Sequence, residues 1–351
     1  MPDHFKRYDK KDILLLTHLR RYETKLGEIV LCDSSNDFEK AIAETTAKYI
    51  IFGIPEDIGV RANLGKGGAD SAWYSFLDSF LNIQSNDFLT GENIFIAGNF
   101  DFSDAEKLIN VNAPTYEEKI MAYRSLVSNV DDAVEEVVKI ITQNKKIPII
   151  IGGGHNNAYP AIKGAAKGLY KAELLQLAQI NCINLDAHTD FRPVEGRHSG
   201  NAFRYADEDG YLNKYCVLGI HENYLQQNVW IDIVNNPFID FISYEDIFIH
   251  EKKSFIQAVA HATSFTSDNF TGIEVDLDSI ENILSSASTP CGINSLHARQ
   301  YINFAAMDST VAYLHICEGA TRLDSGETSS STGKLISYLV SDFVKANLRM
   351  K

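Results

Sequence analysis

Short apolar runs recur along the chain and alternate with longer segments in which apolar residues have helical spacing. Thr115 and Glu118 form a capping box that starts a predicted helix ending near residue 144, and a last helix is predicted at about 333–346. We predict buried strands at residues 48–55 and 93–97, and near 148, 182, 216, 240, 273 and 313. This alternation predicts an α/β domain whose parallel sheet is covered by helices on both faces.

The N-terminal part of the chain has a more polar pattern than the rest. Residues 1–45 are predicted to form an arm with one or two helices, and residues 46–351 a single domain. A glycine-rich loop is expected at 59–68, followed by an apolar helix from residue 72. No linker rich in Pro, Gly or Ser divides the larger part, so we predict no second large domain.

Composition narrows the class of protein. The chain has 351 residues, of which 45% are hydrophobic, and this is enough for a sizeable core. Its formal net charge of −15 argues against binding to nucleic acid or to an anionic membrane surface. No apolar run has the length of a membrane span. The five cysteines show no CxxC spacing, so we predict reduced thiols and a cytoplasmic protein.

Polar clusters follow three of the predicted strands directly. They are Gly152–His155, Asp186–Asp190 and Asp276–Asp278, and together they contain four aspartates and two histidines. In open α/β sheets, ligands bind at the carboxyl ends of the strands. Aspartates gathered there would repel one another and lose hydration unless cations lay between them. The clusters therefore predict a site for two divalent metal ions.

The spacing and type of these side chains indicate which chemistry the site can perform. Asp186, His188 and Asp190 occupy alternate positions, which point to the same side of an extended backbone. A donor set of carboxylates with some imidazole suits Mn²⁺ better than a thiolate-preferring metal, although Fe, Co, Ni and Zn stay open. Two close cations lower the pKa of a shared water molecule, which favours hydrolysis at a carbon or phosphorus centre.

The three clusters, in this order, resemble the ureohydrolase family of arginases, agmatinases and formimidoylglutamases, over roughly residues 48–346. Within that family, residues 59–65, 190–192 and 198–204 are most similar to formimidoylglutamase. The Asn-rich loop that arginases carry after the second cluster is not matched. Two further positions depart from the family pattern: Ser279 follows the Asp-x-Asp motif where Asp-Pro is common, and Gly319 follows Glu318 where a proline motif is common.

The resemblance implies a three-layer α/β/α sandwich with a central, mostly parallel sheet, and a homo-oligomer with two Mn²⁺ ions per subunit. By motif match, Asp186 and Asp276 would be shared by both ions. The full set of implied metal ligands is His155, Asp186, His188, Asp190, Asp276 and Asp278. The resemblance also implies that His198 shuttles protons, that Glu318 grips an amidine or guanidinium group, and that Asp278 helps to stabilise the intermediate.

Two side chains are candidates for contact with the rest of the substrate. Arg192 could hold a substrate carboxylate, or it could form a salt bridge to one of the local acids. Asn201 lies in the same family-like segment as His198 and is the second candidate. Arg61 is a weaker candidate, for which a structural role in its loop is favoured. His315 lies within a predicted strand and is expected to be a hydrogen-bonded core residue.

The function expected from the resemblance is hydrolysis of N-formimidoyl-L-glutamate to L-glutamate and formamide, a step of histidine breakdown. The nearest alternative is an agmatinase, arginase or guanidino-acid hydrolase that releases urea. A dimetal phosphohydrolase is a more remote alternative, because the hydroxyl, lysine and acidic motifs of aspartyl phosphatases are not found in order. A non-catalytic scaffold would be expected to have lost metal ligands, and here none is missing.

Overall fold

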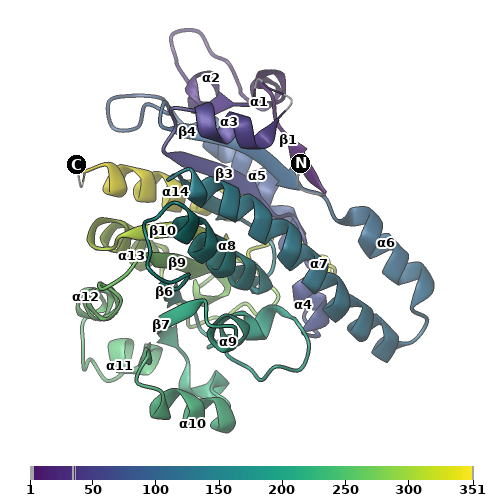
Figure 1. The fold of residues 1–351 in the computed structure, drawn as a ribbon, viewed down its shortest axis with the longest axis vertical. Coiled ribbons are helices and arrows are strands. Elements are labelled where there is room, and N and C mark those ends of the chain that lie inside the picture. The colour runs from purple at the N-terminus through teal and green to yellow at the C-terminus, as the bar shows by residue number, and fades with distance from the viewer. Residues whose placement is uncertain (1–3, 34, 36, 350–351) are drawn as a thin grey trace.

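The computed structural model describes residues 4–33, 35 and 37–349. Within these residues one ten-stranded sheet runs through the molecule (Figure 1). Its strands are β1 (Phe5–Arg7), β2 (Leu31–Cys32), β3 (Tyr49–Gly53), β4 (Ile94–Phe100), β5 (Ile147–Ile151), β6 (Ile180–Leu185), β7 (Leu212–Ile220), β8 (Ile239–Ser243), β9 (Thr271–Asp276) and β10 (Val311–Cys317). All the strands that the sequence predicts are confirmed, with small shifts at their ends.

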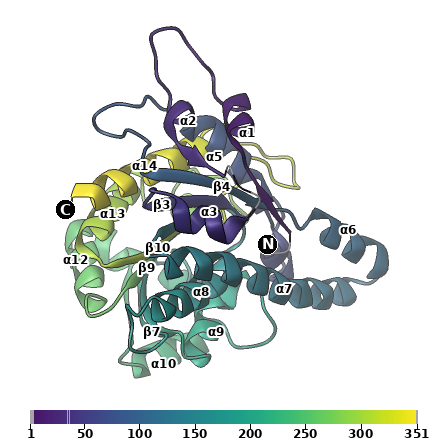
Figure 2. The ribbon, with the colours of Figure 1, turned by 45° about the horizontal axis from the view of Figure 1, so that its top comes forward.

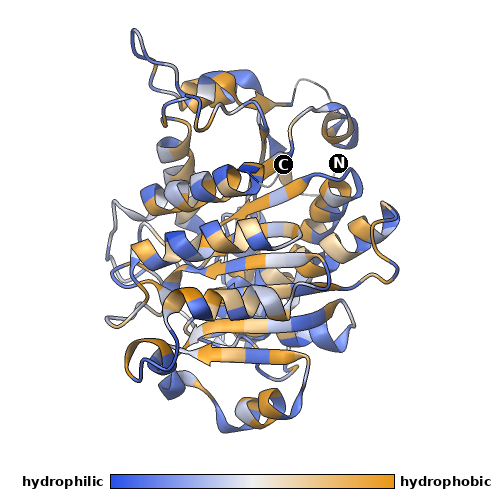
Figure 3. Cartoon of the chain, turned by 90° about the vertical axis from the view of Figure 1, so that its left-hand side faces the viewer, coloured by the Kyte–Doolittle hydropathy of each residue, from blue (hydrophilic) through white to orange (hydrophobic). Residues whose placement is uncertain are grey.

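The strand order is β1-β4-β3-β5-β10-β9-β6-β7-β8, with β2 also paired to β4. Only β1 runs antiparallel to its neighbour among the described strands, and the other pairs are parallel. A parallel sheet covered on both faces needs apolar side chains on both sides. The strands in Figure 3 are accordingly mostly orange, the colour of hydrophobic residues.

Helices cover both faces of the sheet and enclose two hydrophobic cores. On one face pack α5 (Ala72–Phe80), α12 (Phe255–Phe265), α13 (Ser295–Asp308) and α14 (Thr332–Arg349). On the other face pack α3 (Phe38–Glu44), α7 (Tyr116–Gln143), α8 (Ala158–Lys171), α9 (Ala202–Glu208) and α10 (Gln227–Asn235). This arrangement confirms the predicted three-layer α/β/α architecture.

The remaining helices are shorter or lie at the periphery. They are α1 (Lys10–Leu15), α2 (Leu26–Ile29), α4 (Ile58–Ala62), α6 (Ser103–Asn112) and α11 (Tyr244–Phe248). In both Figure 1 and Figure 2, α6 and the first turns of α7 project from the body of the molecule. The capping box of Thr115 and Glu118 at the start of α7 is confirmed. Among the described residues, no helix combines the length and the apolar character that crossing a membrane requires.

The N-terminal residues contribute more than the helical arm that the sequence predicts. β1 and β2 both pair with β4, so this part of the chain extends the same sheet. Phe5 in β1 is buried and packs edge-on against Phe38 and Phe100. The sequence does not predict these two strands because each is only two or three residues long, which is too short to show an alternating pattern.

Candidate active site

Four neighbouring strands end at one place. β5, β10, β9 and β6 are adjacent and parallel, so their carboxyl ends meet at the same edge of the sheet. The segments that follow these strands carry the side chains of the three predicted clusters. They also carry the glutamate that is predicted to bind the substrate. These side chains are His155 after β5, Glu318 after β10, Asp276 and Asp278 at the end of β9, and Asp186, His188 and Asp190 after β6.

His155 is fully buried and faces three aspartates with one ring nitrogen. Its Nδ1 atom lies 2.8 Å from Asp190, 3.2 Å from Asp276 and 3.3 Å from Asp186. One donor atom from each of these four residues lies within 4.8 Å of the others. This is the arrangement that a single metal ion with nitrogen and oxygen ligands requires.

His188 forms a second group with two aspartates. Its Nδ1 atom lies 3.2 Å from Asp278 and 3.5 Å from Asp186, and these three residues also offer donor atoms within 4.8 Å of one another. Asp186 belongs to both groups, as a shared ligand must. Asp276 belongs to the first group alone, and its Oδ1 atom accepts the backbone N–H of Asp278 at 2.8 Å.

The electrostatics of the metal-free cluster show that its charges are not balanced. Burial, together with the charge of Asp186, raises the pKa of Asp190 to about 6. Burial and neighbouring carboxylates raise the pKa of Asp276 well above its ordinary value. Burial acts in the same direction on Asp186, but the nearby imidazole rings of His155 and His188 lower its pKa. These aspartates therefore cannot all be ionised near neutral pH without added positive charge.

Buried polar atoms without hydrogen-bond partners also indicate that the cluster needs added positive charge. In the described part of the chain, Nδ1 of His155 and Oδ1 of Asp278 are buried and have no hydrogen-bond partner. A buried polar atom without a partner costs free energy, so native proteins rarely leave one. Two of these atoms next to four carboxylates fit a pair of divalent cations, and the donor set suits Mn²⁺.

The loop before His155 is held by a glutamate that the sequence pattern does not single out. Glu56 is buried, and its Oε1 atom accepts hydrogen bonds from the Gly154 N–H at 3.0 Å and from Asn157 Nδ2 at 2.6 Å. Its Oε2 atom accepts the Ile58 N–H at 2.7 Å, at the start of α4. Glu56 thus ties the turn that carries His155 to the end of β3.

Two of the site residues have a backbone conformation that side chains other than glycine rarely adopt. Asp190 has a φ of 45° and Glu318 a φ of 61°. Such positions cost on the order of 1–3 kcal/mol and persist where surrounding contacts fix them, often at functional sites. The Glu318 N–H donates to the Gly153 carbonyl at 3.0 Å, which fixes this turn beside the metal cluster.

The cluster opens into a cavity of about 190 Å³. This is below the range of roughly 300–1,000 Å³ that is usual for drug-sized ligands, so a small metabolite fits it better. Residues that line the cavity include Asn63, His188, Asp190, Arg192, Ser199, Gln226, Asp276, Asp278, Ser286 and Glu318. Burial raises the pKa of Glu318 to about 8, and its Oε1 atom accepts the His155 N–H at 2.9 Å.

Arg192 lines the cavity, as a substrate-binding residue must. Its Nη1 atom donates to Asn63 Oδ1 at 2.7 Å, and its Nη2 atom lies 2.7 Å from Glu195. The salt bridge to a local acid is therefore present, while the contact of Arg192 with a substrate carboxylate stays a prediction. Arg61 instead forms ion pairs with Asp57, Glu106 and Asp324 outside the cavity, as its predicted structural role implies.

Two predicted site residues lie behind the cavity wall. The ring of His198 is fully buried, accepts the Gly200 N–H at Nδ1 and lies 3.1 Å from Glu195 at Nε2. Asn201 is also fully buried, and Arg197 and backbone groups use both ends of its amide. Neither residue belongs to the cavity lining, where Ser199 takes their place. The sequence motif could not distinguish which of its neighbouring residues faces the cavity.

The stability of the chain should depend on pH more strongly without metal than with it. The pKa values of Asp190 and Glu318 are raised on folding, so the native state binds protons that the unfolded state releases. Stability of the metal-free chain should therefore fall as pH rises from about 5 to 8. Bound cations remove this penalty, so the increase in Tm on adding Mn²⁺ should be larger at pH 8 than at pH 5.5.

Differential scanning fluorimetry at both pH values, with and without Mn²⁺, measures this difference. Glu56 and Glu106 also have raised pKa values of about 7, so the metal-free trend alone does not isolate the site. The Mn²⁺-dependent increment does isolate it, and Asp190→Asn should make that increment less dependent on pH. An increment that is the same at both pH values would contradict the charge distribution described above.

Comparison with known proteins places this geometry in a family. The model of the arginase family matches residues 47–341. The formimidoylglutamase of Streptococcus pyogenes serotype M3 is 26% identical over 233 residues, which are 65% of this chain and 63% of that protein. The match thus spans less than two thirds of that relative's length.

Two solved structures have the same fold. The formimidoylglutamase of Bacillus subtilis superimposes with a TM-score of 0.70 at 15% identity, covering 95% of each chain. The formiminoglutamase of Trypanosoma cruzi with Mn²⁺ superimposes with a TM-score of 0.68 at 20% identity, covering 92% of this chain and 98% of that one. Because the family model matches most of the chain, and the sheet and clusters agree with it, the chain belongs to the arginase family.

Proposed function

We propose that this chain is a metal-dependent hydrolase of a linear amidine, N-formimidoyl-L-glutamate, which it converts to L-glutamate and formamide. The observation that carries this proposal is the pair of overlapping carboxylate and histidine groups at one cavity, with the buried Glu318 beside them. The names of the streptococcal and Bacillus relatives support the substrate. Water would add to the amidine carbon, and the bond from that carbon to the glutamate nitrogen would break.

The first metal ion would be held by His155, Asp186, Asp190 and Asp276, and the second by His188, Asp278 and the shared carboxylates. We propose Mn²⁺ for both positions, in agreement with the donor types and with the metal named for the trypanosomal relative. When bound, two such ions lower the pKa of a shared water molecule and polarise the reacting centre.

Glu318 is suited to recognise the cationic amidinium group. Its carboxyl lies at the cavity wall with Oε1 on the His155 N–H and Oε2 3.5 Å from Ser286 Oγ. A planar cation can donate two parallel hydrogen bonds to such a carboxylate. The raised pKa of Glu318, about 8, favours its neutral form in the empty cavity, and a bound cation would favour the ionised form.

Asp278 is proposed to help stabilise the intermediate, and His198 is proposed to transfer protons. Asp278 lines the cavity and has a buried Oδ1 atom without a hydrogen-bond partner in the described part of the chain, so it can accept a hydrogen bond from the reacting centre. His198 does not line the cavity, but its Nε2 atom lies 3.1 Å from Glu195, which also contacts the cavity residue Arg192. We therefore propose that any proton from His198 passes by way of Glu195.

The carboxylates of the substrate require positive or hydrogen-bonding groups at the cavity mouth. Arg192 supplies the charge, and Asn63, Ser199 and Gln226 supply neutral polar groups in the lining of the same cavity. A substrate carboxylate would have to replace Glu195 at the Arg192 guanidinium. Since Arg192 and Glu195 are both partly exposed, their ion pair is weak enough to exchange.

Arg192→Ala should reduce kcat/KM for formimidoylglutamate by about ten- to a hundredfold. A hydrogen bond to a charged group contributes roughly 1.5–3 kcal/mol, and 1.4 kcal/mol is about one decade. The metal content should not change. Arg124→Ala is a matched control, because Arg124 also contacts the Glu195 region but does not line the cavity. Equal losses in both variants, or on substrates without carboxylates, would mean that Arg192 has a structural role.

Location and assembly follow from the same proposal. We infer that the chain acts in the cytoplasm, as a homo-oligomer, with residues 46–351 as the catalytic domain. All five cysteines are free, and Cys182, Cys216 and Cys317 are buried, in agreement with a reducing compartment.

A product assay on a panel of substrates tests the proposed function. The Mn²⁺-loaded protein is incubated with formimidoylglutamate, arginine, agmatine and a guanidino acid, and formamide and urea are measured separately. We expect formamide from formimidoylglutamate at the highest rate. Faster release of urea from any guanidino substrate would overturn the substrate but not the metal site.

A further inference from the structure

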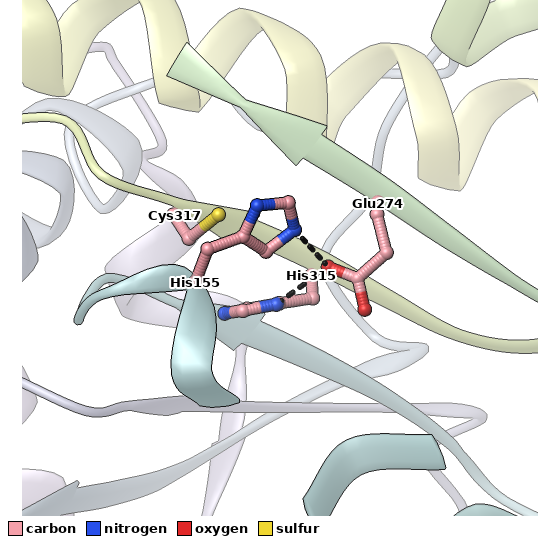
Figure 4. Close-up of side chains that lie close together, drawn as sticks. All are labelled: His155, Glu274, His315 and Cys317. Carbon is pink, nitrogen blue, oxygen red and sulfur yellow. Dashed lines mark hydrogen bonds and ion pairs between the residues drawn. The ribbon is translucent and has the colours of Figure 1, made fainter. Parts of the chain in front are cut away.

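A polar pair lies in the centre of the sheet, outside the cavity. Glu274 in β9 and His315 in β10 are directly opposite one another in the parallel register, and both are fully buried. Figure 4 shows the Glu274 carboxyl facing the rings of both His315 and His155. The buried, hydrogen-bonded state of His315 agrees with the sequence-based expectation, whereas the sequence-based candidates do not include Glu274.

Glu274 has three neighbours that can donate to its carboxylate. Its Oε2 atom is 2.6 Å from His315 Nδ1 and 3.5 Å from His155 Nε2. Its Oε1 atom accepts the Tyr313 hydroxyl at 2.7 Å. The distance to His155 is longer than an ordinary hydrogen bond but within the range of an ion pair. The carboxylate is therefore fixed from the side of β10 and faces the outer edge of the His155 ring.

Burying this pair in the middle of a sheet costs free energy. Removing polar groups from water costs free energy, most of all for an ionised carboxylate, and well-packed apolar residues in place of a buried polar pair are often as stable or more stable. The flanking residues of β9, Ile273 and Val275, are the apolar residues expected in a buried parallel strand. Stability of the sheet alone does not require Glu274, so its contact with His155 suggests another purpose.

The ring of His155 must be oriented for one particular nitrogen to bind a cation. Its Nδ1 atom faces Asp186, Asp190 and Asp276, so the ring proton must be on Nε2 when Nδ1 is a metal ligand. The Nε2 atom faces Glu274. We propose that Glu274, held by His315 and Tyr313, is a positioning residue that fixes this form of the His155 ring and thereby sets the metal affinity of its site.

This inference rests on the metal-binding part of the proposed function. A carboxylate that accepts the second N–H of a ligating histidine orients the ring and makes it a stronger donor, and its removal typically weakens metal binding about 10–100-fold. Glu274→Gln keeps the size of the side chain but removes its charge. The variant should therefore bind one of the two Mn²⁺ ions about 10–100-fold more weakly and leave the other, which His188 serves, nearly unchanged.

The test is titration of the metal-free full-length chain with Mn²⁺, followed by calorimetry and by the electron paramagnetic resonance signal of free and coupled Mn²⁺. We expect two binding events in the unmodified chain and a selective weakening of one in Glu274→Gln. In a His155→Ala background the same substitution should have little further effect, because its effect acts through that ring. Affinities within about twofold of the unmodified chain would overturn the inference.

Two further variants separate positioning from general stability. Asp131→Asn is a matched control, because Asp131 is also a buried carboxylate but pairs with Arg197 rather than with a proposed ligand. It should lower Tm without weakening Mn²⁺ binding. His315→Gln removes a hydrogen-bond partner of Glu274 but keeps Glu274 itself. It should weaken binding of the same Mn²⁺ ion, but less than Glu274→Gln does. If Glu274→Gln does not fold, His315→Gln is the variant that tests the inference. Failure of the unmodified chain to bind Mn²⁺ would instead refute the proposed function.

Discussion

Asp276→Asn is expected to remove most of the activity and to lower the metal content of the chain. Asp276 ends β9, is buried, and contributes to the group formed with His155, Asp186 and Asp190. The substitution keeps the size of the side chain but removes a negative charge that two cations are proposed to share. It also leaves Oδ1 able to accept the Asp278 N–H, so the turn itself should survive.

The size of the effect follows from the cost of unbalanced charge in a buried site. Removing one partner of a buried charged pair costs about 3–5 kcal/mol. At 1.4 kcal/mol per decade, this corresponds to a rate that is lower by roughly a hundredfold to several thousandfold. The loss should appear in kcat at limiting Mn²⁺ and be recovered only in part at high Mn²⁺. Both are measured by initial rates over a range of Mn²⁺ concentrations, with elemental analysis of the isolated protein.

Asp268→Asn is the matched control for this experiment. Asp268 precedes the opposite end of the same strand and is half exposed, where it pairs with Lys214. Its substitution should leave both rate and metal content nearly unchanged. If Asp276→Asn keeps a near-normal rate at limiting Mn²⁺, then Asp276 is not shared by two ions, in line with its membership of one donor group alone.

Removing the metal is expected to abolish activity and to lower Tm. A ligand that binds only the native state stabilises it by about 2.7 kcal/mol when its free concentration is 100 times Kd. Two ions would then contribute about 5 kcal/mol, and Tm changes by roughly 2–4 °C per kcal/mol in domains of 150–250 residues. This chain of 351 residues is longer and should shift less, by roughly 1.4 °C per kcal/mol, so a fall of about 7 °C is expected after chelation and dialysis.

Scanning fluorimetry before and after chelation measures this change, and readdition of Mn²⁺ should restore both Tm and activity. Readdition of Mg²⁺ is the informative control. Mg²⁺ prefers oxygen ligands and retains much of its water, so it should restore less of either quantity than Mn²⁺ does. A chain that shows the same Tm and contains no metal before chelation would contradict the proposed site.

The position of the acidic clusters was predictable because each directly follows an apolar strand. Parallel strands bring their carboxyl ends to one edge, so the sequence alone places Gly152–His155, Asp186–Asp190 and Asp276–Asp278 together. The strand order was not predictable in this way. The adjacency of β9 and β10, which brings Glu318 to the cluster, depends on tertiary packing that no local pattern records.

The limits of the motif are clearest on the loop after β6. His198, Ser199 and Asn201 are so close in sequence that their order says nothing about which side chain faces the cavity. The 3₁₀ turn Ser199–Asn201 directs Ser199 into the cavity and leaves His198 and Asn201 behind it. Only the backbone path of that turn distinguishes them.

Charged residues within or just after apolar strands are the sequence signal from which Glu274 and Glu56 could have been predicted to be important. Glu274 interrupts an apolar run, and Glu56 directly follows one. A charge at such a position is costly unless it is paired, so each predicts a partner nearby, although the partner cannot be named from the sequence. The partner of Glu274 is His315 in the neighbouring strand β10, and the partner of Glu56 is the loop after β5 that precedes His155.

Turnover of formimidoylglutamate by the metal-free chain during stepwise addition of Mn²⁺ tests the central claim most directly. Proton NMR measures the concentrations of glutamate and formamide in the same sample. We predict no turnover without metal, equal amounts of the two products once it begins, and a rate that rises until two Mn²⁺ ions are bound per chain. Turnover without metal, or no formamide when two ions are bound, would contradict the account.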